Sequence, residues 1–156
     1  ALQSLQTEQP LSRFPFLFWM TLGEAQLQQG DPGNALLSYT MAISQTKWPA
    51  IAYVSRGQAH HATGDYEYAI ADLTKAIELD PHLAEAYISR AMAFERLEQF
   101  EDALSDANEA LSQSPNSNRI LLIRSRLRLK AGMADASQHD MQSALNVQPK
   151  TVEDWV

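Results

Sequence analysis

Three arginines and three aspartates recur along the chain at a constant spacing that would let them pair. The arginines are Arg56, Arg90 and Arg124, and each is followed, always at the same shorter interval, by an aspartate. These aspartates are Asp72, Asp106 and Asp140. We interpret the pairs as ion pairs that join consecutive helices, each worth ~0.2–1 kcal/mol where exposed. The alternative is a ladder of arginines that binds a ligand.

The other residues that could support chemistry do not form a recognisable site. His60 and His61 are adjacent and so point to different faces of a helix, and no two histidines have the spacing of three or four residues that helical metal sites use. Cysteine is absent. There is no glycine-rich phosphate loop and no serine elbow. We therefore expect no metal site, no cofactor and no enzymatic activity.

The arginines and aspartates belong to a repeat that runs through most of the chain. Its period of about 34 residues predicts stacked supersecondary units. When successive repeats are aligned, four further columns of equivalent residues share the register of the Arg and Asp columns. They are Ala42, Ala76, Ala110 and Ala144; Pro81, Pro115 and Pro149; Trp19, Tyr53, Tyr87 and Leu121; and Gly23, Gly57, Ala91 and Ser125.

The columns resemble the tetratricopeptide repeat, whose pattern is Trp-x2-Leu-Gly-x2-Tyr, then Ala-x3-Phe, then Pro. Trp19, Leu22 and Gly23 match the start of this pattern, and Ala103 and Pro115 match later positions. The last repeat departs from it, since Arg128 stands where an aromatic residue is usual. The resemblance covers four repeats: residues 16–49, 50–83, 84–117 and 118–151.

The predicted fold is all-α, and each repeat is a pair of helices of about 14 residues, the usual globular length. Gly30, Gly64 and Gly132 are expected to end the first helix of their repeats, where a left-handed residue is often needed. The prolines follow the second helix and stop it. By resemblance to the family, the pairs stack into a right-handed α-solenoid whose first helices line a concave groove.

Three columns of the first helices are expected to line this groove by that resemblance. They are Leu17, Ile51, Glu85 and Arg119; Met20, Val54, Ile88 and Leu122; and Glu24, Gln58, Met92 and Arg126. The second column is apolar throughout, which predicts an apolar floor for an amphipathic helix or an extended peptide. The alternative is that adjoining helices or the chain's own tail cover this floor.

Chaperone-binding members of the family clamp a carboxylate with Lys and Asn on one first helix, Asn on the next, and Lys and Arg on the third. In the better register these places hold Val54, Gln58, Ser89, Leu122 and Arg126, so that one of five agrees. In the other register they hold Met20, Glu24, Ser55, Ile88 and Met92. We therefore do not expect a co-chaperone role.

The charge distribution argues against nucleic acid as a partner. The net charge is −7, whereas nucleic-acid binding needs an excess of Lys and Arg. One helix is basic and has no acidic residue, with Arg119, Arg124, Arg126, Arg128 and Lys130. Aromatic residues for base stacking are missing beside it. We expect this end of the groove to prefer an acidic group on a protein partner.

The two ends of the repeat array differ from its middle. Phe18 occupies the column of Ala52 and Ala86, and residues 1–15 are expected to cap it. The alternative is a homo-oligomer that forms through this apolar patch. Trp155 lies one repeat after Leu121, so residues 152–156 are expected to begin a capping helix or a truncated fifth repeat. We interpret the chain as a fragment of a longer repeat array.

The sequence as a whole predicts a protein-interaction scaffold that binds a peptide or amphipathic helix of another protein. The rival hypotheses are a self-assembling structural subunit and the scaffold part of a larger multidomain protein. No apolar run approaches the roughly 18 residues of a membrane span, so membrane insertion is not expected. The compartment is not determined by the sequence, and the cytoplasm is favoured.

Overall fold

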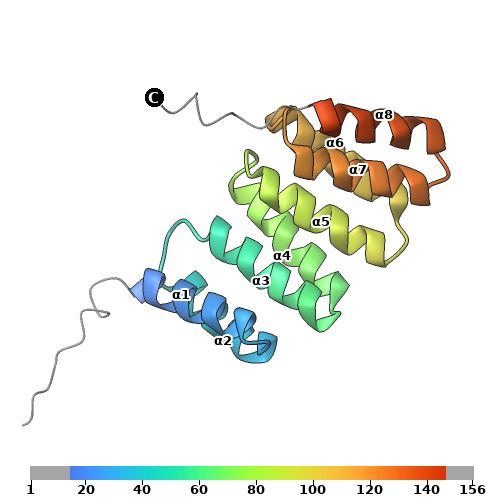
Figure 1. Ribbon diagram of the computed structural model, residues 1–156. Helices are drawn as coiled ribbons and strands as arrows, with labels where there is room; N and C mark the ends of the chain where they lie inside the picture. Colours follow the sequence, from blue (N-terminus) through green and yellow to red (C-terminus); the bar gives the residue numbers. More distant parts are fainter. Residues whose placement is uncertain (1–14, 147–156) are drawn as a thin grey trace, which may run out of the picture.

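The chain folds into four helix pairs that stack one after another, as the computed structural model shows for residues 15–146 (Figure 1). Each pair is a helical hairpin, and the structure of this part of the chain is all-α. The helices are α1 (Pro15–Gln28), α2 (Pro32–Ser44), α3 (Ala50–Thr63), α4 (Tyr66–Leu79), α5 (Ala84–Arg96), α6 (Phe100–Gln113), α7 (Asn118–Lys130) and α8 (Ala134–Asn146). None of these helices is long and apolar enough to cross a membrane.

The helix ends follow local capping chemistry. The side chain of Asp31 accepts a hydrogen bond from the backbone N–H of Asn34 at 3.2 Å, and Pro32 follows it at the first helical position of α2. Ser117 caps α7 in the same way, through the N–H of Ile120 at 3.4 Å. At the other end of α3, Gly64 has a φ of 87°, and its N–H bonds back into the helix. The expected left-handed helix ends at Gly30, Gly64 and Gly132 are confirmed.

Within each pair the two helices approach closely because one of them carries small residues. A Cβ atom on Gly57 would lie 2.8 Å from Cγ of Leu73 and 3.2 Å from the carbonyl oxygen of Ala69. A Cβ atom on Gly23 would lie 2.7 Å from the ring of Tyr39. Both distances are too short for any side chain larger than glycine. In the third repeat Ala91 meets a smaller partner, Ala107, and both are fully buried.

Each hydrophobic core is shared between two consecutive pairs. Tyr39 of α2 clusters with Ala59 of α3. The next cluster joins Val54 and Leu73 to residues of α5, and a third joins Ile88 to residues of α7. Contacts between α1 and α3 and between α3 and α5 make these three first helices a continuous layer. Such an array is stabilised by contacts between neighbours and not by one central core.

The predictions for the two ends of the chain concern residues outside the described range. The N-terminal cap and the start of a further helix or repeat at 152–156 therefore remain predictions. Phe18, which lies in α1, is half-buried and packs edge-on against Trp19, with ring centroids 5.0 Å apart.

One residue of the third repeat takes the left-handed conformation without being glycine. Glu98 has a φ of 60° at the position that Gly30, Gly64 and Gly132 occupy in the other repeats. A left-handed conformation costs an L-residue roughly 1–2 kcal/mol, part of which is offset by the greater freedom of unfolded glycine. We predict that Glu98→Gly raises the free energy of unfolding by about 1 kcal/mol in urea titrations.

The matched control is Gly64→Glu, which places a side chain in the same conformation and should lower that free energy by a similar amount. A Glu98→Gly variant that is less stable than the wild type would contradict the prediction.

Candidate functional site

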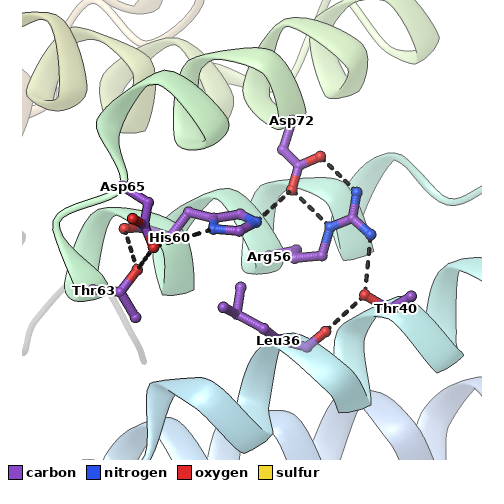
Figure 2. A network of polar contacts seen from close by, with 7 residues as sticks. All are labelled: Leu36, Thr40, Arg56, His60, Thr63, Asp65 and Asp72. Atoms are coloured by element: carbon purple, nitrogen blue, oxygen red, sulfur yellow. Dashed lines mark hydrogen bonds and ion pairs between the residues drawn. The ribbon is translucent and has the colours of Figure 1, made fainter.

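The arginines and aspartates that recur in the sequence are in contact in the structure. Arg56 donates through Nε and Nη2 to the two carboxylate oxygens of Asp72, both at 2.7 Å (Figure 2). Arg90 and Asp106 form the same two bonds at 2.8 Å. Arg124 bonds to Asp140 at 2.8 and 2.6 Å. This two-bond geometry is the strongest that a guanidinium and a carboxylate can form.

Each of these arginines also reaches back to the preceding repeat. Nη1 of Arg56 donates to Oγ1 of Thr40 at 3.0 Å, and Arg90 donates to Thr74 at 2.8 Å. Arg124 donates to Oδ1 of Asn108 at 2.8 Å. Each arginine therefore ties together three helices: the two of its own pair and the second helix of the pair before. All three guanidinium nitrogens are engaged, which favours a structural role over a ligand-binding ladder.

These acceptors were not predicted from the sequence, although it contains a signal for them. Thr40, Thr74 and Asn108 themselves form a column of the repeat, and all can accept a hydrogen bond. The first repeat lacks the arginine and the aspartate. There Ser38 donates instead to Gln26, at 2.7 Å.

His60 extends the network around Arg56 and does not form a metal site. Its Nε2 lies 3.9 Å from Asp72, and its Nδ1 lies 3.9 Å from Asp65 (Figure 2). The ring stacks on Tyr68, with centroids 5.4 Å apart. Thr63 donates to Asp65 at 2.6 Å. Within residues 15–146, no group of three His, Asp or Glu side chains could hold a metal ion.

Two adjoining clefts lie along the first helices, and together we call them the α3–α5–α7 groove. One cleft has a volume of about 180 Å³, and the other has a volume of about 300 Å³. His61 and Met92 line both of them. The remaining lining residues are Gln58, Glu85, Ser89 and Arg119 in the first cleft, and Glu95, Arg96, Arg126 and Lys130 in the second.

Hydrogen bonds across the groove link side chains of consecutive repeats. Nε2 of Gln58 donates to Glu85 and to Ser89, both at 3.0 Å. Glu85 in turn accepts from Nη2 of Arg119 at 3.1 Å. These bonds hold the polar side chains of the first cleft in defined positions.

A buried carboxylate anchors the second cleft. Glu95 is buried and accepts from Arg126 at 2.7 Å, and Nζ of Lys130 lies 2.9 Å from its other oxygen. Burial alone would raise the pKa of Glu95, but Lys130 and Arg126 together outweigh it and hold that pKa below its usual value of 4.5. Burial, aided by Arg96, lowers the pKa of His61, so its imidazole is neutral at neutral pH.

The prediction of an apolar groove floor is wrong for the two central residues of the column. Val54 and Ile88 are only 7% and 1% exposed, because the first helix of the following repeat covers them. Met20 is half-buried against the Tyr39 cluster. Leu122 is exposed, as no helix follows α8 in the described residues. The alternative hypothesis, in which adjoining helices cover this column, is correct for Val54 and Ile88.

The other predicted groove residues fall into two groups. Leu17 and Ile51 are exposed beyond the clefts, towards the N-terminal end, and Glu24 is exposed there too. Gln58, Glu85, Met92, Arg119 and Arg126 line the clefts. Arg119 and Arg126 are already paired with carboxylates, a pairing that was not predicted from the sequence.

Several lining residues were not identified from the sequence. They are His61, Ser89, Glu95, Arg96 and Lys130. Two of them could have been found, since His61 and Glu95 stand two helical turns after Val54 and Ile88 and so lie on the same helix face.

Comparison with known proteins identifies the repeats. Residues 50–83 and residues 84–117 each match a family model described as tetratricopeptide repeat. No curated protein matches the chain in sequence.

Solved structures share the fold. The crystal structure of MamA has a TM-score of 0.77 at 22% identity, over 88% of this chain and 81% of that one. The Arabidopsis OM64 TPR domain has a TM-score of 0.70 at 27% identity, over 73% and 94%. The first TPR of Spaghetti (RPAP3), bound to HSP90 peptide SRMEEVD, has a TM-score of 0.71 at 20% identity, over 75% and 93%.

The bonds between Arg90 and Asp106 predict how much this ion pair contributes to stability. Arg90→Leu leaves the buried Asp106 without its partner and should lower the free energy of unfolding by about 3 kcal/mol. The double variant Arg90→Leu/Asp106→Ser has the residues of the first repeat, Leu22 and Ser38, and should lose less than half as much. Urea titration at neutral pH measures both. Equal losses for the single and double variants would show that the pair does not carry this energy.

The buried carboxylate predicts a pH dependence. The folded pKa of Glu95 is lowered, so the stabilisation it provides is complete above about pH 5 and is lost as the pH falls through that folded pKa. We expect Glu95→Gln to be less stable than the wild type at pH 7 and equally stable in acid, in urea titrations across this range. Glu67→Gln, at an exposed position of α4, is the matched control. A stability difference for Glu95→Gln that is constant with pH would contradict the assignment.

Proposed function

We propose that this chain, which belongs to the tetratricopeptide repeat family, is a protein-interaction scaffold that holds an extended peptide of a partner in the α3–α5–α7 groove. The observation that carries the proposal is the pair of adjoining clefts along three successive first helices. Because the clefts cross from one repeat to the next, a bound segment would contact several repeats at once.

The chemistry of the lining suits a peptide. Met92 lies where the clefts meet, and its flexible thioether adapts to apolar side chains of different shapes. Around it, Gln58, Ser89 and His61 supply donors and acceptors for peptide backbone groups. A small apolar centre with a few placed polar groups is the usual composition of a ligand site.

The charges of the lining favour an acidic peptide. Four cationic side chains line the clefts (Arg96, Arg119, Arg126 and Lys130), against the carboxylates of Glu85 and Glu95. The excess of positive charge would steer acidic segments to the groove and disfavour basic ones.

A related fold binds a peptide, since the first TPR of Spaghetti (RPAP3) is described as bound to an HSP90 peptide. That likeness supports a peptide as the class of ligand and does not extend to its sequence. Val54 and Leu122 stand at two of the carboxylate-clamp positions of this chain, and neither can donate a hydrogen bond. The proposed ligand is therefore a different acidic peptide.

The test is to select binders from a display library of random peptides and to measure their affinity by calorimetry. We predict that the selected peptides are rich in Asp and Glu. The variant Gln58→Ala/Met92→Ala should bind them at least about tenfold more weakly, because removing a central contact usually costs more than ~1 kcal/mol.

The control variant is Met41→Ala/Gln45→Ala, which removes the same residue types from the exposed surface at the end of α2. It should bind as tightly as the wild type. Selected peptides that bind the groove variant with unchanged affinity would show that they bind elsewhere, and the groove proposal would fail.

A further inference from the structure

A third cleft lies at one edge of the stack, between the turn that joins α5 to α6 and the turn that joins α7 to α8. These turns, residues 97–99 and 131–133, lie on the same side of the stack (Figure 1). The cleft has a volume of about 450 Å³, larger than either cleft of the α3–α5–α7 groove. Its walls belong to two neighbouring pairs, so it lies between repeats and not at an end of the stack. We call it the edge cleft.

Three carboxylates line the edge cleft without a partner among residues 15–146. Glu98, Glu101 and Asp102 are exposed, accept no side-chain hydrogen bond and form no ion pair in this part of the chain. Arg90 acts on Asp102 only through space, because its guanidinium is bonded to Asp106. The edge cleft is therefore acidic, which favours a positively charged occupant.

The preceding interface shows a cation at the equivalent place. Arg96 lies over the ring of Tyr66, with its Cζ atom 5.4 Å from the ring centroid. One repeat later these positions hold Lys130 and Phe100, and Phe100 lines the edge cleft. Nζ of Lys130 lies 2.9 Å from Glu95 instead. Within the described part of the chain, no guanidinium lies over the ring of Phe100.

The two interfaces differ because of one residue on the first helix. Glu95 offers Lys130 a carboxylate, whereas its counterpart one repeat earlier is His61, whose imidazole is neutral. Arg96 therefore has no carboxylate at that place and lies over an aromatic ring. The ring of Phe100 keeps the same position in its own repeat but lacks the cation.

The rest of the lining is apolar and suits the carbon stem of a basic side chain. Leu104 and Ala131 are half-buried, and Met133 is exposed. Ala131 stands where the preceding interface has Leu97, and the smaller side chain leaves room for an occupant. Long basic side chains lay their methylene groups along such apolar surface while the charged head reaches polar groups.

We propose that the edge cleft binds an arginine side chain from a basic segment of a partner protein. Its guanidinium lies over Phe100, and its charge is balanced by the carboxylates of the lining. Arginine fits better than lysine because a planar guanidinium stacks on a ring, as Arg96 does inside the molecule. This site is separate from the α3–α5–α7 groove, for which an acidic peptide is proposed, and it takes a ligand of opposite charge.

The experiment is a titration of the ¹⁵N-labelled full chain with the blocked peptide Ala-Arg-Ala-Arg-Ala, followed by backbone amide chemical shifts. The comparison peptide carries citrulline, which has a similar shape and no charge, in place of both arginines. We expect saturable shifts at Phe100, Glu101 and Ala131, with a dissociation constant of about 1 mM for contacts by one or two side chains. The citrulline peptide should produce none.

Three variants test the parts of the site. Phe100→Leu removes the ring face and should weaken binding about two- to fivefold. Glu101→Gln/Asp102→Asn removes two of the carboxylates and should weaken binding about fivefold. Ala131→Leu restores the residue of the preceding interface, fills the cleft and should abolish the shifts.

The matched controls change the counterparts of these residues. Tyr66→Leu removes the ring that Arg96 already covers. Glu67→Gln/Asp135→Asn removes two exposed carboxylates at the positions equivalent to Glu101, and it leaves the same net charge as the double variant of the cleft. Both controls should bind the basic peptide as the wild type does.

The groove variant Gln58→Ala/Met92→Ala separates this site from the α3–α5–α7 groove. It should bind the basic peptide with unchanged affinity, although it is expected to lose acidic peptides. A millimolar contact is too weak to be enriched in peptide display, so the two tests do not interfere. Groove binding that fails while the edge cleft still binds would reject the proposed function alone.

Four outcomes would overturn the inference about the edge cleft. The first is an arginine peptide that shifts no amide of the lining, and the second is a citrulline peptide that shifts the same amides. The third is unchanged affinity in Phe100→Leu and Ala131→Leu, each shown to be folded by circular dichroism. The fourth is an equal loss in Glu67→Gln/Asp135→Asn and in the double variant of the cleft, because binding would then depend on net charge alone.

Discussion

No helix pair of this chain can bury its apolar face by itself, and the rest of the structure depends on that constraint. Val54 and Ile88 belong to first helices, yet both are buried only because the next first helix lies over them. The next first helix comes close enough to do this because alanine occupies its contact positions, as at Ala86 and Ala93, which cluster with Val54. Stability therefore arises at the interfaces between repeats.

The hydrogen bonds of Arg56, Arg90 and Arg124 fix the orientation of the packed helices. Apolar contacts alone tolerate small shifts, whereas a planar guanidinium with a two-bond contact to Asp106 and a third bond to Thr74 fixes the angle between three helices. Val54 and Ile88 are buried between stacked repeats. Polar side chains such as Gln58, Glu95 and Arg126 therefore form most of the lining of the groove. The surface available for recognition is thus what stacking leaves uncovered.

Much of this could be predicted from the sequence, because it depends on local periodicity. The columns of the repeat predict the helix pairs, and the glycines predict where first helices end. The pairing of Arg56 with Asp72 could be anticipated for the same reason, since both residues belong to one hairpin and their spacing recurs in the next two repeats. Residues that repeat together within one hairpin are close in space whatever the curvature of the whole array.

The sequence by itself determined the all-α class, the repeat and the arginine–aspartate partners within each hairpin. Only the tertiary structure decided which columns face a neighbouring repeat and which face solvent. The column of Val54 and Ile88 is apolar in sequence whether it faces a neighbouring repeat or the solvent. Periodicity does not show which of the two covers it. The pairing of Glu95 with Arg126 and Lys130 likewise could not be read from spacing, because it joins two repeats. The angle at which one helix pair settles on the next is set by side-chain volumes at the interface, and that angle selects the residues that remain exposed.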